Sequence, residues 1–473
     1  PYNWWNEALH GVARNGRATV FPQAIGMAAT FDDDLLFRVA TAISDEARAK
    51  FNIAQSMENY AQYAGLTFWS PNVNLFRDPR WGRGMETYGE DPYLQARLGT
   101  AFVKGLQGND EHHMKAAACA KHYVVHSGPE ALRHEFDAVA PKKDFYESYL
   151  PAFEALVKEG GVECVMCAYN RTYGEPACGS ELLLQEILRD DWGFEGHVVS
   201  DCGAVRDFHM NHKVAPNEAE AAAWALKAGT DVNCGDYYDH LPAALEQGLI
   251  SEDDIDTALR RLLNTKMKLG FFDEQTAWSN ISADVVESEG HVRLTREVAR
   301  KSLVLLKNRN KVLPLKKDIR KLYVVGPHAA NSDVLMGNYY GLSSNNISIL
   351  DGIVSKVSAG TTINYKYGQL PYRANVNPID WTTGGAGNAD TTIAVLGISG
   401  LLEGEEGEAI VSPSKGDRLE LDLPSDQLDF LRKLREKSSN PIILVLTGGS
   451  PITTPEIEEL ADAILFAWYP GQQ

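Results

Sequence analysis

The chain has 473 residues, of which 44% are hydrophobic, and its 45 basic and 64 acidic side chains give a formal net charge of −19. This length predicts about two to four domains. The acidic balance argues against nucleic acid and anionic membrane as partners, because both require clustered Lys and Arg. No run of about 18 apolar residues is present that could span a membrane. The aromatic-rich start and the apolar run before Gln473 lead us to expect a chain truncated at both ends.

Strand-like and helix-like segments alternate through residues 1–270. Acidic residues from Asp32 open an amphipathic helix, and an Ala-rich helix is stopped by Gly229. The Ala-rich helix covers 217–228, and another helix is predicted over 255–269. Buried strands are predicted over 66–70, 115–121, 162–169, 197–200 and 230–233. This repeated order predicts an α/β fold with a parallel barrel or a doubly wound sheet.

A second α/β unit is predicted to begin near residue 300. Its expected strands cover 321–325, 391–396, 441–446 and 463–467, and a helix over 428–434 is opened by Pro424 and Ser425. The polar segment before this unit has the composition of a linker.

Polar residues lie at or shortly after the ends of several strands predicted in the first unit. They are Arg83, Lys121 with His122, Tyr169 with Asn170, and Asp201, and Arg133 lies shortly after one of these strand ends. Because the carboxyl ends of parallel strands share one face of a barrel, we expect these side chains to form one polar pocket. Nearby Lys and Arg keep a carboxylate ionised, as a nucleophile or an electrostatic stabiliser requires.

A second group of carboxylates lies in the other unit. Residues 403–408 place four glutamates in a Gly-rich loop after the 391–396 strand. A solvated acidic turn is one interpretation of this loop. Alternatively, the like charges raise each other's pKa, as a general acid at neutral pH requires. One ionised and one protonated carboxyl is the arrangement for cleaving a glycosidic bond.

The six cysteines are too few to hold a chain of this size together. Cys164 and Cys167 have the spacing of a redox or metal motif, but strand alternation sends them to opposite faces. We interpret them as small buried hydrophobic residues. A disulfide between Cys202 and Cys234 is left open.

Six motifs in order carry a family resemblance: Trp5–Gly11, Asp78–Arg83 running to Pro92, Ala120–Tyr123, Met166–Asn170, Val199–Asp201, and Glu403–Glu405 followed by Gly416-Asp417-Arg418. On these residues the chain resembles glycoside hydrolase family 3, and most closely its β-xylosidase-like branch. The resemblance implies a (β/α)8-type barrel over 1–272 with its first strand missing. It further implies a linker over 273–300 and an incomplete α/β sandwich domain over 301–473 that supplies the acid/base.

By this resemblance, Asp201 matches the nucleophile and Glu405 the general acid/base, although Glu406 or Glu408 could hold that role. Substrate-binding positions are matched by Arg83, Lys121, His122, Arg133 and Tyr169. The implied mechanism is double displacement with retention of configuration. No metal or organic cofactor is required.

Glu7 determines the expected substrate. Glucosidases of the family usually carry Asp here, and the longer side chain of Glu7 reaches where a hexose hydroxymethyl would project. We therefore expect an exo-acting β-xylosidase that releases β-D-xylose from xylo-oligosaccharides. The alternatives are a β-glucosidase, a bifunctional β-xylosidase/α-L-arabinosidase, and a catalytically silent sugar-binding homologue. Family analogy implies a secreted or periplasmic protein, and a homo-oligomer is left open.

Overall fold

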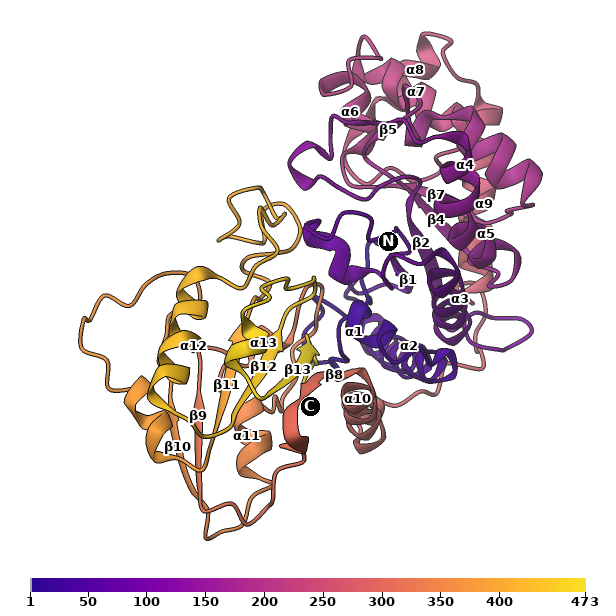
Figure 1. The fold of residues 1–473 in the computed structure, drawn as a ribbon. Helices are drawn as coiled ribbons and strands as arrows, with labels where there is room; N and C mark the ends of the chain where they lie inside the picture. The colour runs from indigo at the N-terminus through magenta and orange to yellow at the C-terminus, as the bar shows by residue number, and fades with distance from the viewer. Residues whose placement is uncertain (1) are drawn as a thin grey trace.

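The computed structural model describes residues 2–473 as two α/β bodies that pack side by side (Figure 1). In the first body four strands pair in parallel in the order β1 (Thr67–Phe68), β2 (Ala117–Tyr123), β4 (Cys164–Cys167) and β7 (His197–Ser200). Single bridges from Asn6 to Phe68 and from Val199 to Val232 extend this sheet at its two edges. The result is a barrel-like parallel sheet.

Helices surround this sheet, and local sequence signals define their ends. The Asp32 side chain accepts the Leu35 N–H to cap α2 (Asp33–Ser56), and Asn217 caps α7 (Glu218–Ala228). A capping box formed by Ser251 and Asp254 opens α9 (Glu252–Lys268). The remaining helices are α1 (Ala24–Ala28), α3 (Pro92–Gln107), α4 (Lys142–Asp144), α5 (Pro151–Lys158), α6 (Ala204–Met210), α8 (Leu241–Glu246) and the π-helical η3 (Phe145–Tyr149) and η5 (Leu182–Asp191). A small separate sheet contains β3 (Asp137–Ala138), β5 (Arg171–Thr172) and β6 (Glu175–Pro176).

The second body is built on a sheet of six strands. Their order is β10 (Thr362–Lys366), β9 (Lys321–Val325), β11 (Thr391–Gly397), β12 (Ile442–Thr447), β13 (Ala463–Trp468) and β8 (Val304–Asn308). All neighbours are parallel except β8, which runs antiparallel to β13. Residues of α12 (Ser425–Lys437) and α13 (Ile457–Leu460) share a core with one face of the sheet, and residues of α11 (Ile349–Val354) pack on the other.

Most predicted elements are present, and the predicted α/β class with two domains is confirmed. The strands predicted over 197–200 and 321–325 have these bounds in β7 and β9. The edge strands β8 and β10, whose residues are partly or fully exposed, were not predicted. The strand predicted over 230–233 is reduced to the single bridge of Val232.

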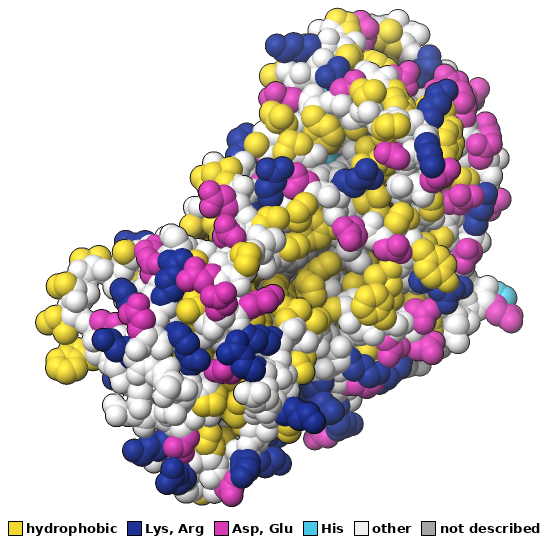
Figure 2. All heavy atoms as spheres, in the orientation of Figure 1, with side chains coloured by type: hydrophobic (Ala, Val, Ile, Leu, Met, Phe, Trp, Pro, Cys, Tyr) yellow, Lys and Arg dark blue, Asp and Glu magenta, His cyan; other side chains and the backbone are white. Residues whose placement is uncertain are grey.

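The segment expected as a linker over 273–300 contains most of another helix, α10 (Glu289–Ser302). This helix contacts α1, α2 and β13, so it lies between the two bodies (Figure 1). Charged side chains of both signs are interspersed over the face shown in Figure 2, and apolar side chains gather in the hollow between the two bodies. Within residues 2–473, no helix combines the length and the apolar content needed to cross a membrane.

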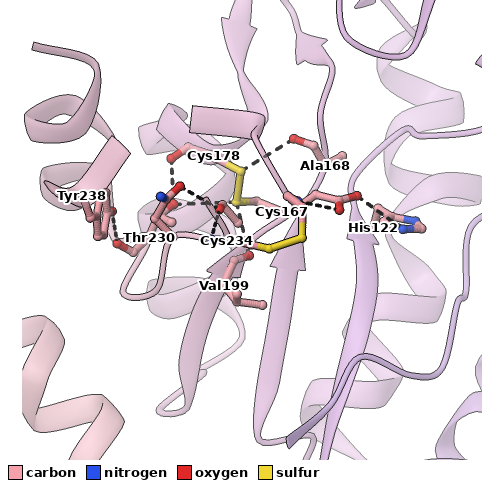
Figure 3. Close-up of a disulfide and its surroundings, with 12 residues drawn as sticks. His122, Cys167, Ala168, Cys178, Val199, Thr230, Cys234 and Tyr238 are labelled. Atoms are coloured by element: carbon pink, nitrogen blue, oxygen red, sulfur yellow. Dashed lines mark hydrogen bonds and ion pairs between the residues drawn. A yellow bond between two sulfur atoms is a disulfide. The ribbon is translucent and has the colours of Figure 1, made fainter. Parts of the chain in front are cut away.

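Two disulfides lie at the carboxyl ends of the barrel strands (Figure 3). The Cys202–Cys234 disulfide that was left open is present, and a second one joins Cys167 to Cys178. The interpretation of Cys167 as a small hydrophobic residue is therefore wrong, because its partner lies in the turn after β6, which the strand pattern does not reveal. Alternation along β4 holds, since Cys164 instead meets the Cys119 thiol on β2, with 2.8 Å between the sulfur atoms.

His197, the first residue of β7, links stability to pH. Its ring is buried, and its Nδ1 lies 2.9 Å from Thr265 Oγ1. Burial, with Arg189 and Lys268 nearby, lowers the pKa of His197 to about 3. Below about pH 6.5 the unfolded chain binds a proton that the folded protein excludes, so stability falls as the pH decreases. Between pH 6.5 and pH 5, this histidine alone lowers the unfolding free energy by about 2 kcal/mol.

We therefore expect His197→Gln to lose less unfolding free energy than the unmodified protein when the pH is lowered from 7 to 5. Urea unfolding at both pH values measures this difference, with His112→Gln, on an exposed loop, as the control. An identical pH-dependent loss in the protein with and without His197 would contradict the assignment.

Candidate active site

One cavity of about 270 Å³ brings together all but one of the side chains that the sequence predicted for the site. Its lining includes Glu7, Arg83, Lys121, His122, Arg133, Tyr169 and Asp201 from the first body and Glu405 from the second. The predicted pocket therefore exists, and it is shared between the two domains. Asn170, also expected at this pocket, lies behind it and pairs with the His126 ring, with 3.1 Å between Asn170 Oδ1 and His126 Nδ1.

Strand ends position four of the lining residues that the sequence predicted. Lys121 and His122 lie near the carboxyl end of β2, Tyr169 lies two residues beyond β4, and Asp201 directly follows β7. These three strands are parallel neighbours, so their ends open on the same side of the sheet. Arg83 is held in the 3-10 turn η1 (Gly82–Glu86), and Arg133 follows the 3-10 turn η2 (Glu130–Leu132).

Asp201 presents one free carboxylate oxygen within the pocket. Its Oδ1 accepts the backbone N–H of Cys202 at 2.8 Å. Its Oδ2 is buried without a hydrogen-bond partner among residues 2–473, and lies 3.5 Å from His122 Nε2. Burial raises the pKa of Asp201, whereas Arg83 and Arg133 oppose that rise by stabilising the ionised form. An unpartnered carboxylate oxygen beside cationic groups is a competent nucleophile.

Arg83 and His122 form a rigid, buried support for this carboxylate. The Arg83 guanidinium donates to both oxygens of Glu86 at 2.9 Å, and its Nη2 lies 3.3 Å from His122 Nε2. Burial, followed by the charge of Arg83, lowers the pKa of His122 well below its usual value, so the ring is neutral. Its Nε2 therefore accepts from Arg83, while its Nδ1–H donates to Asn74 Oδ1 at 2.9 Å.

Glu7 and Lys121 form a buried ion pair on one wall of the pocket. Lys121 Nζ lies 3.0 Å from Glu7 Oε2, and Trp5 Nε1 donates to Glu7 Oε1 at 3.1 Å. Burial raises the pKa of Glu7 to about 7, even though Lys121 favours its ionised form. The Trp5 ring stacks on Trp69, with ring centroids 5.2 Å apart, so the wall is held in place by aromatic packing.

Glu405 enters the pocket from the second domain and meets three groups there. Arg133 Nη1 donates to its Oε1 at 2.8 Å, Arg83 Nη1 lies 3.4 Å from the same oxygen, and the Tyr339 hydroxyl donates to Oε2. Burial raises the pKa of Glu405, but Arg83, Arg133 and Tyr339 outweigh it and lower the pKa to about 2. The expectation that neighbouring glutamates raise this pKa is therefore wrong, because the arginines of the barrel lie closer than the other acids.

The other glutamates of the loop have different surroundings. Glu403 is turned into its own domain, where its carboxylate accepts from Gly449 N, Ser450 Oγ and Tyr469 Oη. Glu406 and Glu408 also line the cavity, but Glu406 pairs with the exposed Lys415 as well as with Arg133, and Glu408 pairs with the exposed Arg14. Of the three candidates for the acid/base, only Glu405 contacts both Arg83 and Arg133.

Several lining residues were not predicted. They are Trp5, Arg14, Trp69, Met166, Cys202 and Tyr339. Cys202 directly follows Asp201, and its disulfide to Cys234 stiffens the turn beside the carboxylate. Tyr339 lies in a loop of the second domain, so strand or helix periodicity does not mark it. The tandem aromatic residues Tyr339 and Tyr340 are the only hint in the sequence.

Comparison with known proteins places this geometry in a family. Residues 1–265 match the glycosyl hydrolase family 3 N terminal domain, and residues 303–473 match the glycosyl hydrolase family 3 C-terminal domain. A xylan 1,4-beta-xylosidase of Xylanibacter ruminicola is 47% identical over 361 residues, which are 75% of this chain and 42% of that protein.

Solved structures agree with this placement. A GH3 exo-beta-xylosidase in complex with a xylobiose aziridine probe matches with a TM-score of 0.90 and 33% identity, over 100% of this chain and 61% of that one. A β-glucosidase from Erythrobacter marinus matches with a TM-score of 0.88 and 31% identity, over 99% of this chain and 63% of that one. The chain thus spans less than two thirds of each of these relatives. The two domain matches and the shared fold confirm the resemblance seen in the motifs, and the chain belongs to glycosyl hydrolase family 3.

Proposed function

We propose that this protein is a retaining, exo-acting β-xylosidase that releases β-D-xylose from the non-reducing end of xylo-oligosaccharides. The observation that supports this function best is the meeting of Asp201 and Glu405, from different domains, in one cavity lined by cationic and aromatic side chains. Paired carboxyl groups facing one sugar site are the arrangement for hydrolysis of a glycosidic bond. A protein that only binds sugar needs neither carboxylate at this place.

In the proposed first step, Asp201 Oδ2 attacks the anomeric carbon of the sugar. The bond to the leaving oxygen breaks as that oxygen takes the proton of Glu405, and a xylosyl ester of Asp201 forms. In the second step Glu405 removes a proton from water, which attacks the same carbon and releases xylose and the Asp201 carboxylate. Two inversions give net retention and require carboxyl groups about 5–5.5 Å apart.

Glu405 must be protonated for the first step, whereas Arg83 and Arg133 hold it ionised in the free site. We propose that hydroxyl groups of the sugar take over hydrogen bonds of these arginines and that the sugar excludes water. Both changes raise the pKa of Glu405 toward that of a general acid. Arg133 also lies over the Tyr169 ring, at 4.8 Å from its centroid, which gives it a second support when it leaves Glu405.

The buried wall formed by Glu7, Lys121 and Trp5 favours a pentose over a hexose. Hydrogen bonding and ion pairing with Glu7 hold Trp5 and Lys121 in place, so the wall cannot move aside for a larger sugar. A hexose carries an additional hydroxymethyl group, and a difference of this size is worth about 1–3 kcal/mol in a fitted pocket. The likeness to a β-glucosidase structure supports glucoside hydrolysis as the second candidate.

Hydrolysis of 4-nitrophenyl β-D-xyloside and β-D-glucoside tests these candidates. We expect kcat/KM to be at least about tenfold higher for the xyloside, and Glu7→Asp to reduce that ratio by about tenfold, because it shortens the wall by one methylene. Glu154→Asp, at a solvent-facing ion pair of α5, is the matched control. Faster turnover of the glucoside would support the second candidate, and turnover of neither would indicate a binding protein.

A further inference from the structure

The Gly416-Asp417-Arg418 motif has no part in the proposed chemistry, yet its carboxylate is buried against the other domain. Asp417 Oδ1 accepts the N–H of Gly82 and Oδ2 accepts the N–H of Glu130, both at 2.9 Å. Gly82 directly precedes Arg83 in η1, and Glu130 opens the η2 turn that precedes Arg133. One side chain of the second domain therefore holds both turns that carry the arginines of the pocket.

Three glycines make the adjoining contact. A Cβ atom on Gly82 would lie 2.0 Å from the Gly416 carbonyl oxygen and 2.5 Å from that of Gly404. The Gly404 N–H donates to Gly416 O at 3.1 Å, which closes the loop that carries Glu405. The backbone of this loop thus packs directly on the Arg83 turn, and no side chain fits between them.

Glu130 adds a link on the other side of Glu405. Its buried carboxylate accepts the backbone N–H of Glu406 at 3.3 Å, and also accepts from Trp81 Nε1 at 3.2 Å and Arg133 Nη1 at 3.3 Å. The residues before and after Glu405 are therefore both tied to the barrel domain, Gly404 by packing and Glu406 by a hydrogen bond.

We propose that Asp417, Glu130 and the contact of Gly82 with Gly404 and Gly416 form an interdomain clamp that positions Glu405 for proton transfer. The clamp rests on the proposed role of Glu405 as the acid/base. Asp417 and Glu130 are positioning residues, because they act through the Glu405 loop. Since Glu405 and Asp201 belong to different domains, only the interface sets their distance, and a misplacement of about 1 Å costs up to about 100-fold in rate.

The clamp joins the Glu405 loop to the barrel turns, whereas Arg83 itself is also anchored within the barrel by Glu86 and His122. Loss of the clamp is therefore expected to impair proton transfer far more than nucleophilic attack, which gives it a distinct kinetic signature. Xylobiose has a sugar alcohol as its leaving group and needs the acid, whereas 2,4-dinitrophenolate leaves without a proton. Azide gives a second readout, because it needs no base. It attacks the anomeric carbon of the xylosyl ester, the bond to Asp201 breaks, and β-xylosyl azide and the free carboxylate result.

The experiment compares kcat/KM for xylobiose and for 2,4-dinitrophenyl β-D-xyloside, with azide rescue of kcat on the latter, in Glu405→Ala, Asp417→Asn and Asp422→Asn. In Asp417→Asn the side-chain NH2 group replaces one carboxylate oxygen and faces the backbone N–H of Gly82 or of Glu130, so one of the two hydrogen bonds is lost. We expect a loss of about 30- to 100-fold on xylobiose, less than about threefold on the dinitrophenyl substrate, and formation of xylosyl azide. Asp422, which is exposed, contacts Thr453 and Thr454 of its own domain, so its substitution leaves both values within about twofold.

The outcomes separate the clamp from the function on which it rests. If Glu405→Ala lacks this signature, the assignment of the acid/base is wrong. If Glu405→Ala has this signature, but Asp417→Asn reduces kcat/KM equally for both substrates or for neither, the proposed clamp is overturned. Gly82→Ala, which pushes the loop away by steric contact, must reproduce the Asp417→Asn signature, and provides the test if Asp417→Asn fails to fold.

Discussion

Asp201→Asn is expected to lower kcat for 4-nitrophenyl β-D-xyloside by about 10⁴-fold or more, because the amide supplies no anionic oxygen to form the xylosyl ester. The side chain keeps its shape, and the backbone N–H of Cys202 still has an oxygen to donate to. Burial disfavours the ionised carboxylate of Asp201, so its neutral replacement does not weaken the fold. The loss of turnover is therefore separate from any loss of structure.

Steady-state kinetics and thermal unfolding of the same samples check this prediction. Asp190→Asn, on the exposed surface of the barrel domain, is the matched control and keeps full turnover. Trapping with a 2-fluoro-xyloside then places the sugar on the peptide that contains Asp201. Turnover within tenfold of the unmodified protein, or label on another carboxylate, would assign the nucleophile elsewhere.

Lys121→Met is expected to destabilise the protein by about 3–5 kcal/mol at pH 8, because it leaves the Glu7 carboxylate buried without its cation. The pKa of Glu7 is about 7 with Lys121 present, and it rises further without that positive charge. When the pKa of a carboxyl group is raised in the folded state, the unfolding free energy of the protein decreases as the pH increases toward that raised pKa. The cost of Lys121→Met is therefore smaller at pH 6 than at pH 8.

A double-mutant cycle with Glu7→Gln separates the ion pair from the packing of the lysine. Glu7→Gln/Lys121→Met removes both charges, so we expect it to be more stable than Lys121→Met alone, with a coupling of about 1–3 kcal/mol. Urea unfolding at pH 6 and pH 8 measures each corner of the cycle. Strict additivity of the two single changes, or a cost that does not vary with pH, would show that the pair is not coupled.

Much of the barrel and its site could be predicted because the signals are local. Asp201 stands out since a β-branched strand ends immediately before it, and Lys121 and Tyr169 lie at or just beyond the carboxyl ends of buried strands. The carboxyl ends of parallel strands necessarily share one side of the sheet, so their convergence follows from the topology. The family resemblance added Glu7 and Glu405, and the structure brings both into the same cavity.

The electrostatics of Glu405 could not be predicted in this way. From the sequence, its nearest charges are the other glutamates of its loop, which would raise its pKa. In the fold its nearest charges are Arg133, 272 residues away along the chain, and Arg83, and these lower the pKa. Sequence proximity thus gave the wrong sign, because tertiary packing chose different neighbours.

The α/β class, the positions of the central strands and the family could be inferred from the amino-acid sequence, because apolar periodicity, helix caps and motif spacing act within a few residues. Three features became visible only in the folded protein: the Cys167–Cys178 disulfide, the contact of Tyr339 with Glu405, and the contacts of Asp417 and Glu130 across the domains. Each of these joins groups whose local sequences carry no sign of the partner. Their pairing depends on how two domains pack, and that packing is a property of the whole chain.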